Sequence, residues 1–579
     1  MLPISNHRTV AYFSMEIALD GAIPTYSGGL GVLAGDTLRS AADIGVPMAA
    51  ITLLHRKGYF RQRLDAEGNQ SEAPEVWNPA AKLELLPVKA SLWLEGRELH
   101  IGIWRYLIHG IAGHVVPVYL LDPALPENDL QDQALTDNLY SGDQHHRLGQ
   151  EALLGLGGLK ALEALGHSDI EVYHMNEGHS SLLALGLLKR HMDARDALDP
   201  SEDDVLGVRS RCVFTTHTPV PAGHDKFPLD LAEHVLGSDA VRLLQATGGL
   251  GDHSLNMTYL ALRFSHYING VAMHHGEVSR GMFPDYPVRA ITNGVHAITW
   301  TSPAFRELYD HHIPEWRRDN LYLRYAIGIP LDEIAVAHKR AKRLLFEHIH
   351  GRTGVRLQEK ALTIGFARRA TPYKRANLLF SDLERLKQIA QNVGPIQIVY
   401  AGKAHPADEP GKDTIRQVFL AAKALRGAVP VVYLENYDLE SAKLLTSGVD
   451  LWLNTPQRPQ EASGTSGMKA ALNGVPSFSI LDGWWIEGCI EGITGWAIGS
   501  EQLPLNDASD EVASLYDKLE RVIVPMFHGR PSSFAEVMRS AIALNGSFFN
   551  TERMVKQYLA NAYIDDEQPA TASLLVESI

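Results

Sequence analysis

The 579-residue sequence lacks most features that mark secreted, membrane or nucleic-acid-binding proteins. Its two cysteines, Cys212 and Cys489, have no metal-binding or redox spacing, which predicts a reducing compartment. No run of about 20 apolar residues is present and no apolar segment follows a basic N-terminus, so we expect neither a membrane span nor a signal peptide. The net charge of −15 argues against broad nucleic-acid binding, which needs a basic surface. We therefore predict a cytoplasmic protein.

Several catalytic motifs are also missing. The segment HMNEGH separates His174 and His179 by five positions instead of the four of HExxH, so we predict no metal site. PADEPGKDT lacks the first glycine and the hydroxyl of a P-loop. SGGLGVLAGD, residues 27–36, contains GxGxxA, but the acidic ribose partner of a dinucleotide site is not evident. No two carboxylates can be nominated for a retaining glycosidase, whose pair lies about 5 Å apart.

What is present is a long globular chain with 45% apolar and 21% charged residues, enough for two to four domains. The second half alternates short apolar segments with helical patterns. Strands are predicted at residues 361–369, 396–404, 429–436, 449–455 and 475–483, and helices at 376–391, 413–427 and 439–448. This alternation predicts an α/β fold with a parallel, doubly wound sheet.

The first half shows a similar but more interrupted pattern, so we expect two Rossmann-like domains facing a cleft. Glycine and proline break the pattern near residues 291–303. We predict domains at residues 1–295 and 296–545, and a C-terminal segment, 546–579, whose helix could pack back on the first domain. The tail after Asp565 is expected to be loose.

The segment EASGTSGMKAALNG, residues 461–474, places one lysine near the start of a short, nearly apolar helix. Gly464, Thr465 and Ser466 precede this helix, and the start of a helix favours an anion such as phosphate. Thr465 and Lys469 are four positions apart and share a face. A lysine held against a phosphate-bearing aldehyde is what a pyridoxal phosphate Schiff base needs. The alternative is a surface lysine after a Gly/Ser loop.

A second segment, FARRATPYKRANLLF at 366–380, gathers cations in an acidic protein. Arg368, Arg369, Lys374 and Arg375 lie between a predicted strand and a predicted helix. Four cations in eight residues favour a local anion site. A solvated charged loop is the alternative.

These segments resemble motifs of the α-glucan phosphorylases, the family of glycogen, starch and maltodextrin phosphorylases, in the same order over residues 10 to 500. The family patterns are EASGTGNMK, KRIHEYKR and GGLGRLA. Here Ser466-Gly467 replaces Gly-Asn, Ala370-Thr371-Pro372 replaces Ile-His-Glu, and Val32 replaces an arginine. Lys469 itself is retained. The chain is identified as a short, prokaryotic-type member in which control by phosphorylation is not expected.

The resemblance implies roles for individual residues. It implies pyridoxal 5′-phosphate bound to Lys469, and it places around the cofactor Arg368, Lys374, Gly464, Thr465 and Ser466. It assigns catalysis to Arg369 and Lys374, which bind substrate phosphate, and to His217, whose main-chain carbonyl faces the anomeric carbon. It implies that the substrate contacts Gly28, Gly29, Asn293, Glu461, His179 and Tyr373.

The implied reaction is reversible phosphorolysis of an α-1,4-glucan by inorganic phosphate, giving α-glucose 1-phosphate with retention. The implied architecture is the GT-B type of glycosyltransferases, the cofactor phosphate acts as acid and base, and the assembly is a homodimer. A sugar-nucleotide-dependent glucan synthase of the same fold would have no need of Lys469. A non-catalytic glucan-binding protein would not need the intact set of Arg369, Lys374 and Lys469. An aminotransferase-type enzyme would need an acid facing the pyridine nitrogen, which the sequence does not reveal.

Overall fold

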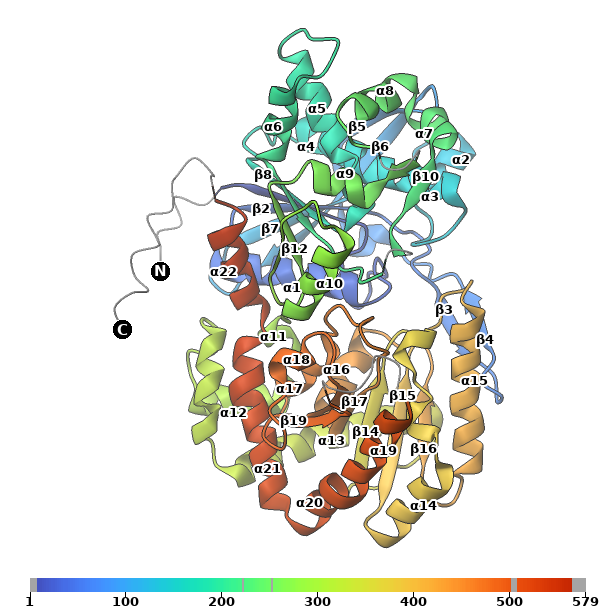
Figure 1. Cartoon of the computed structure of the whole chain (residues 1–579), viewed down its shortest axis with the longest axis vertical. Helices are drawn as coiled ribbons and strands as arrows, with labels where there is room; N and C mark the ends of the chain where they lie inside the picture. Colours follow the sequence, from blue (N-terminus) through green and yellow to red (C-terminus); the bar gives the residue numbers. More distant parts are fainter. Residues whose placement is uncertain (1–7, 221–222, 251–253, 501–507, 565–579) are drawn as a thin grey trace.

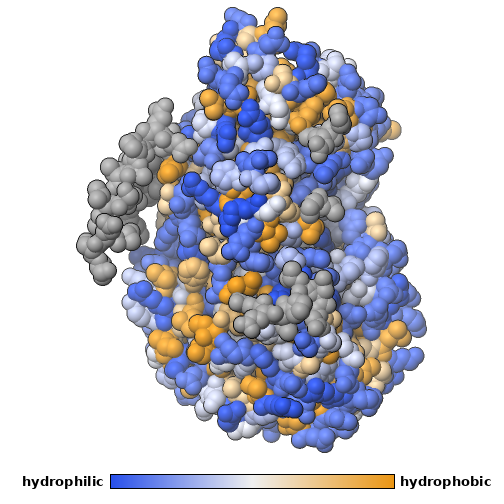
Figure 2. All heavy atoms as spheres, in the orientation of Figure 1, coloured by the Kyte–Doolittle hydropathy of each residue, from blue (hydrophilic) through white to orange (hydrophobic). Residues whose placement is uncertain are grey.

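The computed structural model describes residues 8–220, 223–250, 254–500 and 508–564, and Figure 1 shows two α/β bodies stacked along the long axis. The tail after Asp565 lies outside these residues. Each body is built on one large sheet. Figure 2 shows hydrophilic side chains over most of one face of the molecule. No described helix combines the length and apolar character that a membrane span requires.

The first sheet has nine strands in the order β13-β12-β9-β8-β1-β2-β7-β6-β5. Its strands are β1 Val10–Ser14, β2 Met48–Leu53, β5 Glu84–Leu94, β6 Arg97–His109, β7 Val115–Asp122, β8 Val172–Asn176, β9 Cys212–Thr215, β12 Tyr267–Gly270 and β13 Val288–Ala290. Pairing is parallel from β13 to β7 and antiparallel from β7 to β5. The long antiparallel hairpin β5–β6 explains why the sequence pattern here is interrupted.

The second sheet has six parallel strands in the order β16-β15-β14-β17-β18-β19. They are β14 Leu362–Ala367, β15 Ile396–Ala401, β16 Val431–Leu434, β17 Leu451–Asn454, β18 Ser477–Ile480 and β19 Gly495–Ile498. The first five lie within the five predicted ranges, because buried parallel strands read as short apolar runs. The predicted α/β fold is confirmed.

The helices of the second body differ from prediction where side chains cap them. The helix predicted at 376–391 is wrong in its first part: residues 378–380 form a 3₁₀ turn and α14 spans Leu383–Asn392. Asp382 causes the break, since its carboxylate accepts the Arg385 N–H and starts a new helix. Helix α15, Glu409–Ala424, begins earlier than predicted, with Asp408 as its cap and Pro410 in its first turn. Helix α16, Leu439–Gly448, matches its predicted range.

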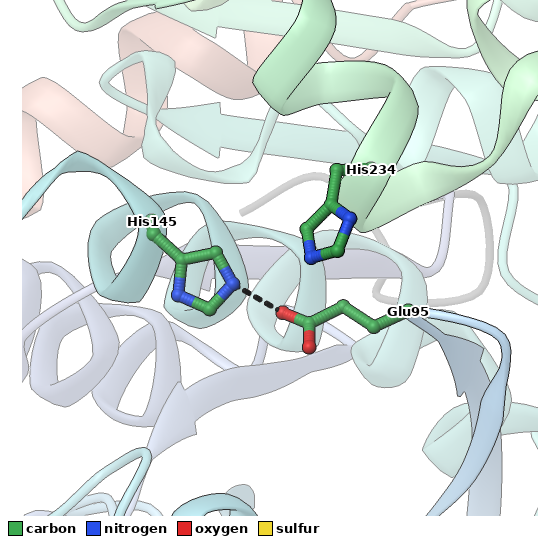
Figure 3. Close-up of side chains that lie close together, drawn as sticks. All are labelled: Glu95, His145 and His234. Atoms are coloured by element: carbon green, nitrogen blue, oxygen red, sulfur yellow. Dashed lines mark ion pairs between the residues drawn. The ribbon is translucent and has the colours of Figure 1, made fainter.

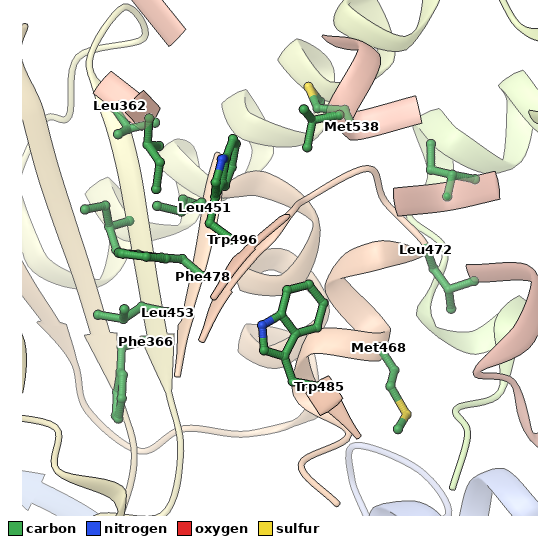
Figure 4. Close-up of a cluster of buried hydrophobic side chains, with 14 of the residues drawn as sticks. Leu362, Phe366, Leu451, Leu453, Met468, Leu472, Phe478, Trp485, Trp496 and Met538 are labelled. Atoms are coloured by element: carbon green, nitrogen blue, oxygen red, sulfur yellow. The ribbon is translucent and has the colours of Figure 1, made fainter. Parts of the chain in front are cut away.

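The core of the second body surrounds the lysine helix α17, Ser466–Ala471. Figure 4 shows side chains from β14, β17 and β18 packed together, with Met468 and Leu472 close by. Met468 and Ala470 are fully buried. Because both neighbours of Lys469 in sequence lie in the core, this lysine does not sit on a solvent-facing helix.

Helix α22, Thr551–Asn561, lies against α1, Gly29–Ile44, beside the first sheet (Figure 1). Its buried residues Met554, Val555 and Tyr558 share a core with β1 and α1. The hydroxyl of Ser40 on α1 lies 2.6 Å from that of Thr551. The chain thus passes through the second body and returns to the first.

Candidate active site

Lys469 is buried where α17 approaches the first body. Its side chain is 7% exposed and its Nζ lies 4.0 Å from the centre of the Trp300 ring. Trp300 ends α11, Ala297–Trp300, and donates its Nε1 hydrogen to Asp36 Oδ2 of α1 at 2.6 Å. Burial lowers the pKa of Lys469 to about 8. No hydrogen bond or ion pair of this amine is present within the described residues, so it is a partly deprotonated, unpaired nucleophile.

Arg368, Lys374 and Glu461 form a buried charged cluster. Arg368 Nη1 and Lys374 Nζ lie 2.8 and 2.5 Å from the same oxygen, Glu461 Oε2. Despite burial, the two cations hold the pKa of the Glu461 carboxyl below its usual value. Tyr373 joins the cluster, with its ring 4.3 Å from Lys374 Nζ. Burial and Arg368 lower the pKa of Lys374 to about 7, so the cluster is only partly positive near pH 7, and a polyanionic ligand would favour the charged form of this lysine.

The other two cations of the basic loop, Arg369 and Arg375, point in different directions. Arg369 is exposed, and within the described chain no ion pair holds it. Its charge partly offsets the burial that raises the pKa values of Tyr59 and Tyr140, so it lies near the first body. Arg375 points away: it is 2.7 Å from Glu511 and donates to the Thr455 carbonyl at 3.0 Å. Arg375 therefore fixes the loop, and three of the four cations remain for an anion.

The predicted glycine loop is the start of helix α1. Gly28 is its N-cap, and a Cβ added at Gly28 or Gly29 would meet no atom within 4 Å. The backbone N–H of Gly28 donates to the Glu16 carboxylate at 3.3 Å, and the Tyr140 hydroxyl donates to the same group at 3.1 Å. Space is therefore open beside Gly28 and Gly29 at the N-terminal end of α1, where the helix dipole is positive.

Gly464 connects the lysine helix to the charged cluster. Its φ of +84° is in the left-handed region, and a Cβ there would lie 3.2 Å from Glu461 Oε1. Thr465 is the N-cap of α17 without a side-chain capping bond, and Ser466 is the first helical residue, one position earlier than predicted. The Ser466 hydroxyl accepts a hydrogen bond from Trp452 Nε1 at 3.1 Å.

His217 follows β9 and is held from two sides. Its backbone N–H donates to Glu177 Oε2 at 2.7 Å, and its Nε2 donates to Asn176 Oδ1 at 2.7 Å. Burial lowers its pKa to about 3, so the ring is neutral at pH 7. The ring therefore does not take up a proton near neutral pH. This agrees with the expected role of the main-chain carbonyl of His217 instead of its side chain.

Among the described residues, Asn293 and His179 each keep a buried polar atom that has no hydrogen-bond partner. Asn293 Oδ1 has none, while its backbone carbonyl accepts a hydrogen bond from Arg553 of α22 at 2.9 Å. His179 Nδ1 also lacks a partner, and its Nε2 lies 3.6 Å from Asp225. Buried polar atoms are normally paired, so unpaired ones are expected where a ligand supplies the partner.

The structure brings the predicted residues together in two groups. One contains Arg368, Tyr373, Lys374, Glu461 and Gly464, with Lys469 on the following helix. The other contains the residues of the first body: Gly28, Gly29, His179, His217 and Asn293. Arg369, near Tyr140, lies between the groups. Within the described residues, no hydrogen bond or ion pair joins His217, His179 or Asn293 to the charged cluster.

Several residues of the site were missed in the sequence. Asp482 accepts the Glu461 N–H at 2.9 Å, and burial raises its pKa to about 6. Glu177 adopts φ +74° while its carboxylate binds the His217 N–H. Trp300 covers Lys469. Asp482 follows β18, so the rule that ligands bind at the carboxyl ends of parallel strands could have found it; Trp300 carries no such signal.

Comparison with known proteins agrees with this geometry. The sequence model of the carbohydrate phosphorylase family matches residues 239–495. The maltodextrin phosphorylase of Thermococcus litoralis is 39% identical over 96% of this chain and 70% of its own length. A glycogen phosphorylase of Mycobacterium tuberculosis has the same identity and coverage, and that of Aquifex aeolicus is 34% identical over 86% of its length. The chain belongs to the carbohydrate phosphorylase family.

Proposed function

We infer that the protein is an α-1,4-glucan phosphorylase, which transfers a terminal glucosyl unit to inorganic phosphate and releases α-glucose 1-phosphate. The observations that carry this inference are the buried Lys469, unpaired within the described residues, and the Arg368–Lys374–Glu461 cluster, whose Glu461 lies in the segment that leads into the lysine helix. A lysine in this state serves a carbonyl ligand, and the adjacent cations serve phosphate. The names of the relatives, maltodextrin and glycogen phosphorylase, support phosphate and an α-glucan as the substrates.

We propose pyridoxal 5′-phosphate on Lys469 as the cofactor, and the residues present fit it. The amine is unpaired and its pKa is lowered. When bound, the cofactor supplies a phosphate group that exchanges a proton with substrate phosphate. Arg368 and Lys374, with Gly464, Thr465 and Ser466 at the start of α17, would hold that group. Without their charge, two adjacent phosphates would repel each other.

Arg369 and Lys374 are proposed to hold substrate phosphate, assisted by the Gly28–Gly29 end of α1. Arg369 suits this role because it is exposed and has no ion-pair partner within the described residues. The positive dipole end of α1 adds to its field. Together they would orient the phosphate for attack on the anomeric carbon and disperse its charge as it moves.

Residues of the first body, together with Glu461 and Tyr373 of the second, are proposed to bind the sugar. The His217 carbonyl would face the anomeric carbon, held in place through Glu177 and Asn176. Asn293 would bind the 6-hydroxyl with its unpaired oxygen, and Glu461 the 3-hydroxyl. His179 and Tyr373 would line the glucan path. Each role uses a polar atom that the fold holds in one orientation.

The direct test is incubation of the purified full chain with maltodextrin and inorganic phosphate, followed by measurement of glucose 1-phosphate. Product that depends on both phosphate and glucan supports the proposal. Glucan elongation from a sugar nucleotide without glucose 1-phosphate turnover would favour the synthase. Glucan binding with neither reaction would favour a binding protein.

The assembly is proposed to be a homodimer, as the resemblance implies. Light scattering of the full chain at several concentrations measures its mass. A monomer mass at all concentrations would contradict this part of the proposal without affecting the reaction.

A further inference from the structure

We propose that Glu95, His145 and His234 form a binding site for a divalent transition metal such as Zn²⁺, separate from the candidate active site. Figure 3 shows the three side chains directed toward one another from three elements. Glu95 lies in the turn between β5 and β6, His145 on α3, Gln144–Ala152, and His234 on α7, Leu229–Leu236.

The three ligand atoms already lie almost as close to one another as the ligands of one metal ion do. One atom from each residue lies within 4.8 Å of the other two, and His145 Nε2 is 2.6 Å from Glu95 Oε1. The rings of His145 and His234 have centres 5.9 Å apart. Ligand atoms bound at about 2.0–2.2 Å to a tetrahedral metal lie about 3.3 Å apart. To bind a metal, the exposed His234 side chain would have to turn toward the other two ligands, and the Glu95–His145 contact would have to lengthen.

The backbone positions Glu95 at an energetic cost. Glu95 has φ +51° and is followed by Gly96 at φ +72°, in a two-residue turn where asparagine, aspartate or glycine is preferred. The turn itself requires positive φ at both positions, so the turn fixes the backbone of Glu95 although a glutamate is uncommon there. The Glu95 N–H donates to the Val235 carbonyl at 3.0 Å, which ties the turn to the residue after His234.

Arg97 orients the carboxylate. Its Nη1 lies 2.7 Å from Glu95 Oε2, which leaves Oε1 directed at the histidines. Arg97 is itself held by Asp132, at 2.6 Å. Metal-binding carboxylates are commonly fixed by such outer hydrogen bonds. One oxygen of Glu95 is therefore held by Arg97, and the other is available to a cation.

The chemical nature of the three ligands determines which metal ions the site would bind. Two imidazoles and one carboxylate suit Zn²⁺ and neighbouring transition metals, whereas Mg²⁺ and Ca²⁺ require mostly oxygen ligands. Three protein ligands at a partly exposed position leave a coordination site for water. The metal would join the β5–β6 turn, α3 and α7, elements distant in sequence, and stabilise the first body.

The test is calorimetric titration of the full chain with ZnCl₂ in phosphate-free buffer, with parallel thermal unfolding. We expect one site per chain that Mg²⁺ and Ca²⁺ do not occupy, and a higher Tm with Zn²⁺. His234→Ala and Glu95→Asn should each weaken this site at least tenfold. His234 is exposed, so His234→Ala should keep the metal-free Tm. Glu95→Asn suits the turn but loses the contacts to Arg97 and His145, so the effect of Zn²⁺ is measured against the metal-free Tm of that variant.

The matched control is His274→Ala on α10, Met273–Met282. His274 lies 3.4 Å from Glu277, a histidine–glutamate pair that no third ligand joins among the described residues. This variant should bind Zn²⁺ like the parent. If His234→Ala and Glu95→Asn retained the parent's affinity and stoichiometry, or if the parent bound no Zn²⁺, the assignment would be wrong.

Discussion

The chemistry of single residues here depends on what burial does to charge. Lys469 loses water contact without gaining an anion, so its amine becomes a nucleophile near neutral pH. Arg368 and Lys374 are also buried but share the Glu461 carboxylate; burial and the nearby Arg368 lower the pKa of Lys374 to about 7, and a bound anion would favour its charged form. Similar side chains thus acquire different roles from their partners.

Replacing Lys469 tests the cofactor assignment. Lys469→Ala should abolish covalent cofactor attachment, because no other amine holds this position on α17. Activity should fall by about 10²–10⁴, the range for losing an acid–base group, and recover in part with added pyridoxal plus phosphite. Mass spectrometry after borohydride reduction measures the attachment.

A matched control is Lys189→Ala, which removes another lysine whose pKa burial lowers, on α5, Leu183–Asp193. It should keep both cofactor and activity. Cofactor retained covalently by Lys469→Ala would instead show that a different lysine carries it.

The pH dependence of reconstitution follows from the pKa of Lys469, which is about 8 instead of 10.5. Only the neutral amine attacks the aldehyde, so the rate at which the cofactor-free protein binds pyridoxal phosphate should rise through pH 8 and then level. Free lysine derivatives should show a rise only near pH 10. Absorbance kinetics between pH 6 and 10 measure this, and a rise centred near 10 would contradict the lowered pKa.

The free energy of unfolding should also depend on the protonation of the Lys469 amine. Between pH 8 and 10.5 the unfolded chain binds a proton at Lys469 that the folded chain does not. The contribution of this residue to the free energy of unfolding therefore increases with pH across that window. Comparison of denaturation curves for the cofactor-free parent and Lys469→Ala isolates it.

At the scale of elements, short helices carry the site and long-range packing holds them. Helix α17 has six residues, too short to be stable alone, and it is fixed by the core around Met468. Helix α22 fixes the first body similarly, and its Arg553 binds the carbonyls of Thr292 and Asn293. Helix α22 thereby positions Asn293, a residue that is proposed to bind the sugar.

Removing a core side chain of α22 should test this coupling. Met554 is 2% exposed between α22 and the first body. Met554→Ala should lower the free energy of unfolding by about 2–5 kcal/mol, because it leaves a cavity. Asn561→Ala, at the exposed end of the same helix, should change it by less than about 0.5 kcal/mol. Equal effects in urea denaturation would contradict the packing role of α22.

At the scale of the whole molecule, a hairpin connects the two bodies. Strands β3, Arg61–Leu64, and β4, Gln70–Ala73, extend from the first body beside α15 (Figure 1). The Gln62 N–H donates to Asn436 Oδ1 at 3.1 Å, and the Asn436 N–H donates to Gln62 Oε1 at 2.9 Å. Gln62 is fully buried and Asn436 half-buried, so both bonds are only partly accessible to water.

Gln62→Ala should therefore loosen the two bodies. It leaves the Asn436 N–H without its side-chain acceptor, at a cost of about 1–3 kcal/mol, and removes one of the two hydrogen bonds that the Gly402 carbonyl accepts. We expect calorimetric unfolding to separate into two transitions. Arg63→Ala removes an exposed ion pair to Glu435 and should cost less than about 1 kcal/mol. A single, unshifted transition in Gln62→Ala would argue against this connection.

The sequence by itself determined the features that local patterns encode. Buried parallel strands read as apolar runs, so five strands of the second sheet and helix α16 were predictable. The lysine segment and basic loop were recognisable because their spacing carries the chemistry. The break before α14 was not, because a single cap at Asp382 overrides helical periodicity.

Only the tertiary structure decided which charges meet and which are buried. It directed Arg375 to Glu511, placed Trp300 over Lys469 and used Glu177 to hold His217. It also gathered Glu95, His145 and His234. These outcomes depend on contacts between residues far apart in the chain, whose energies arise from burial and pairing that no local periodicity records.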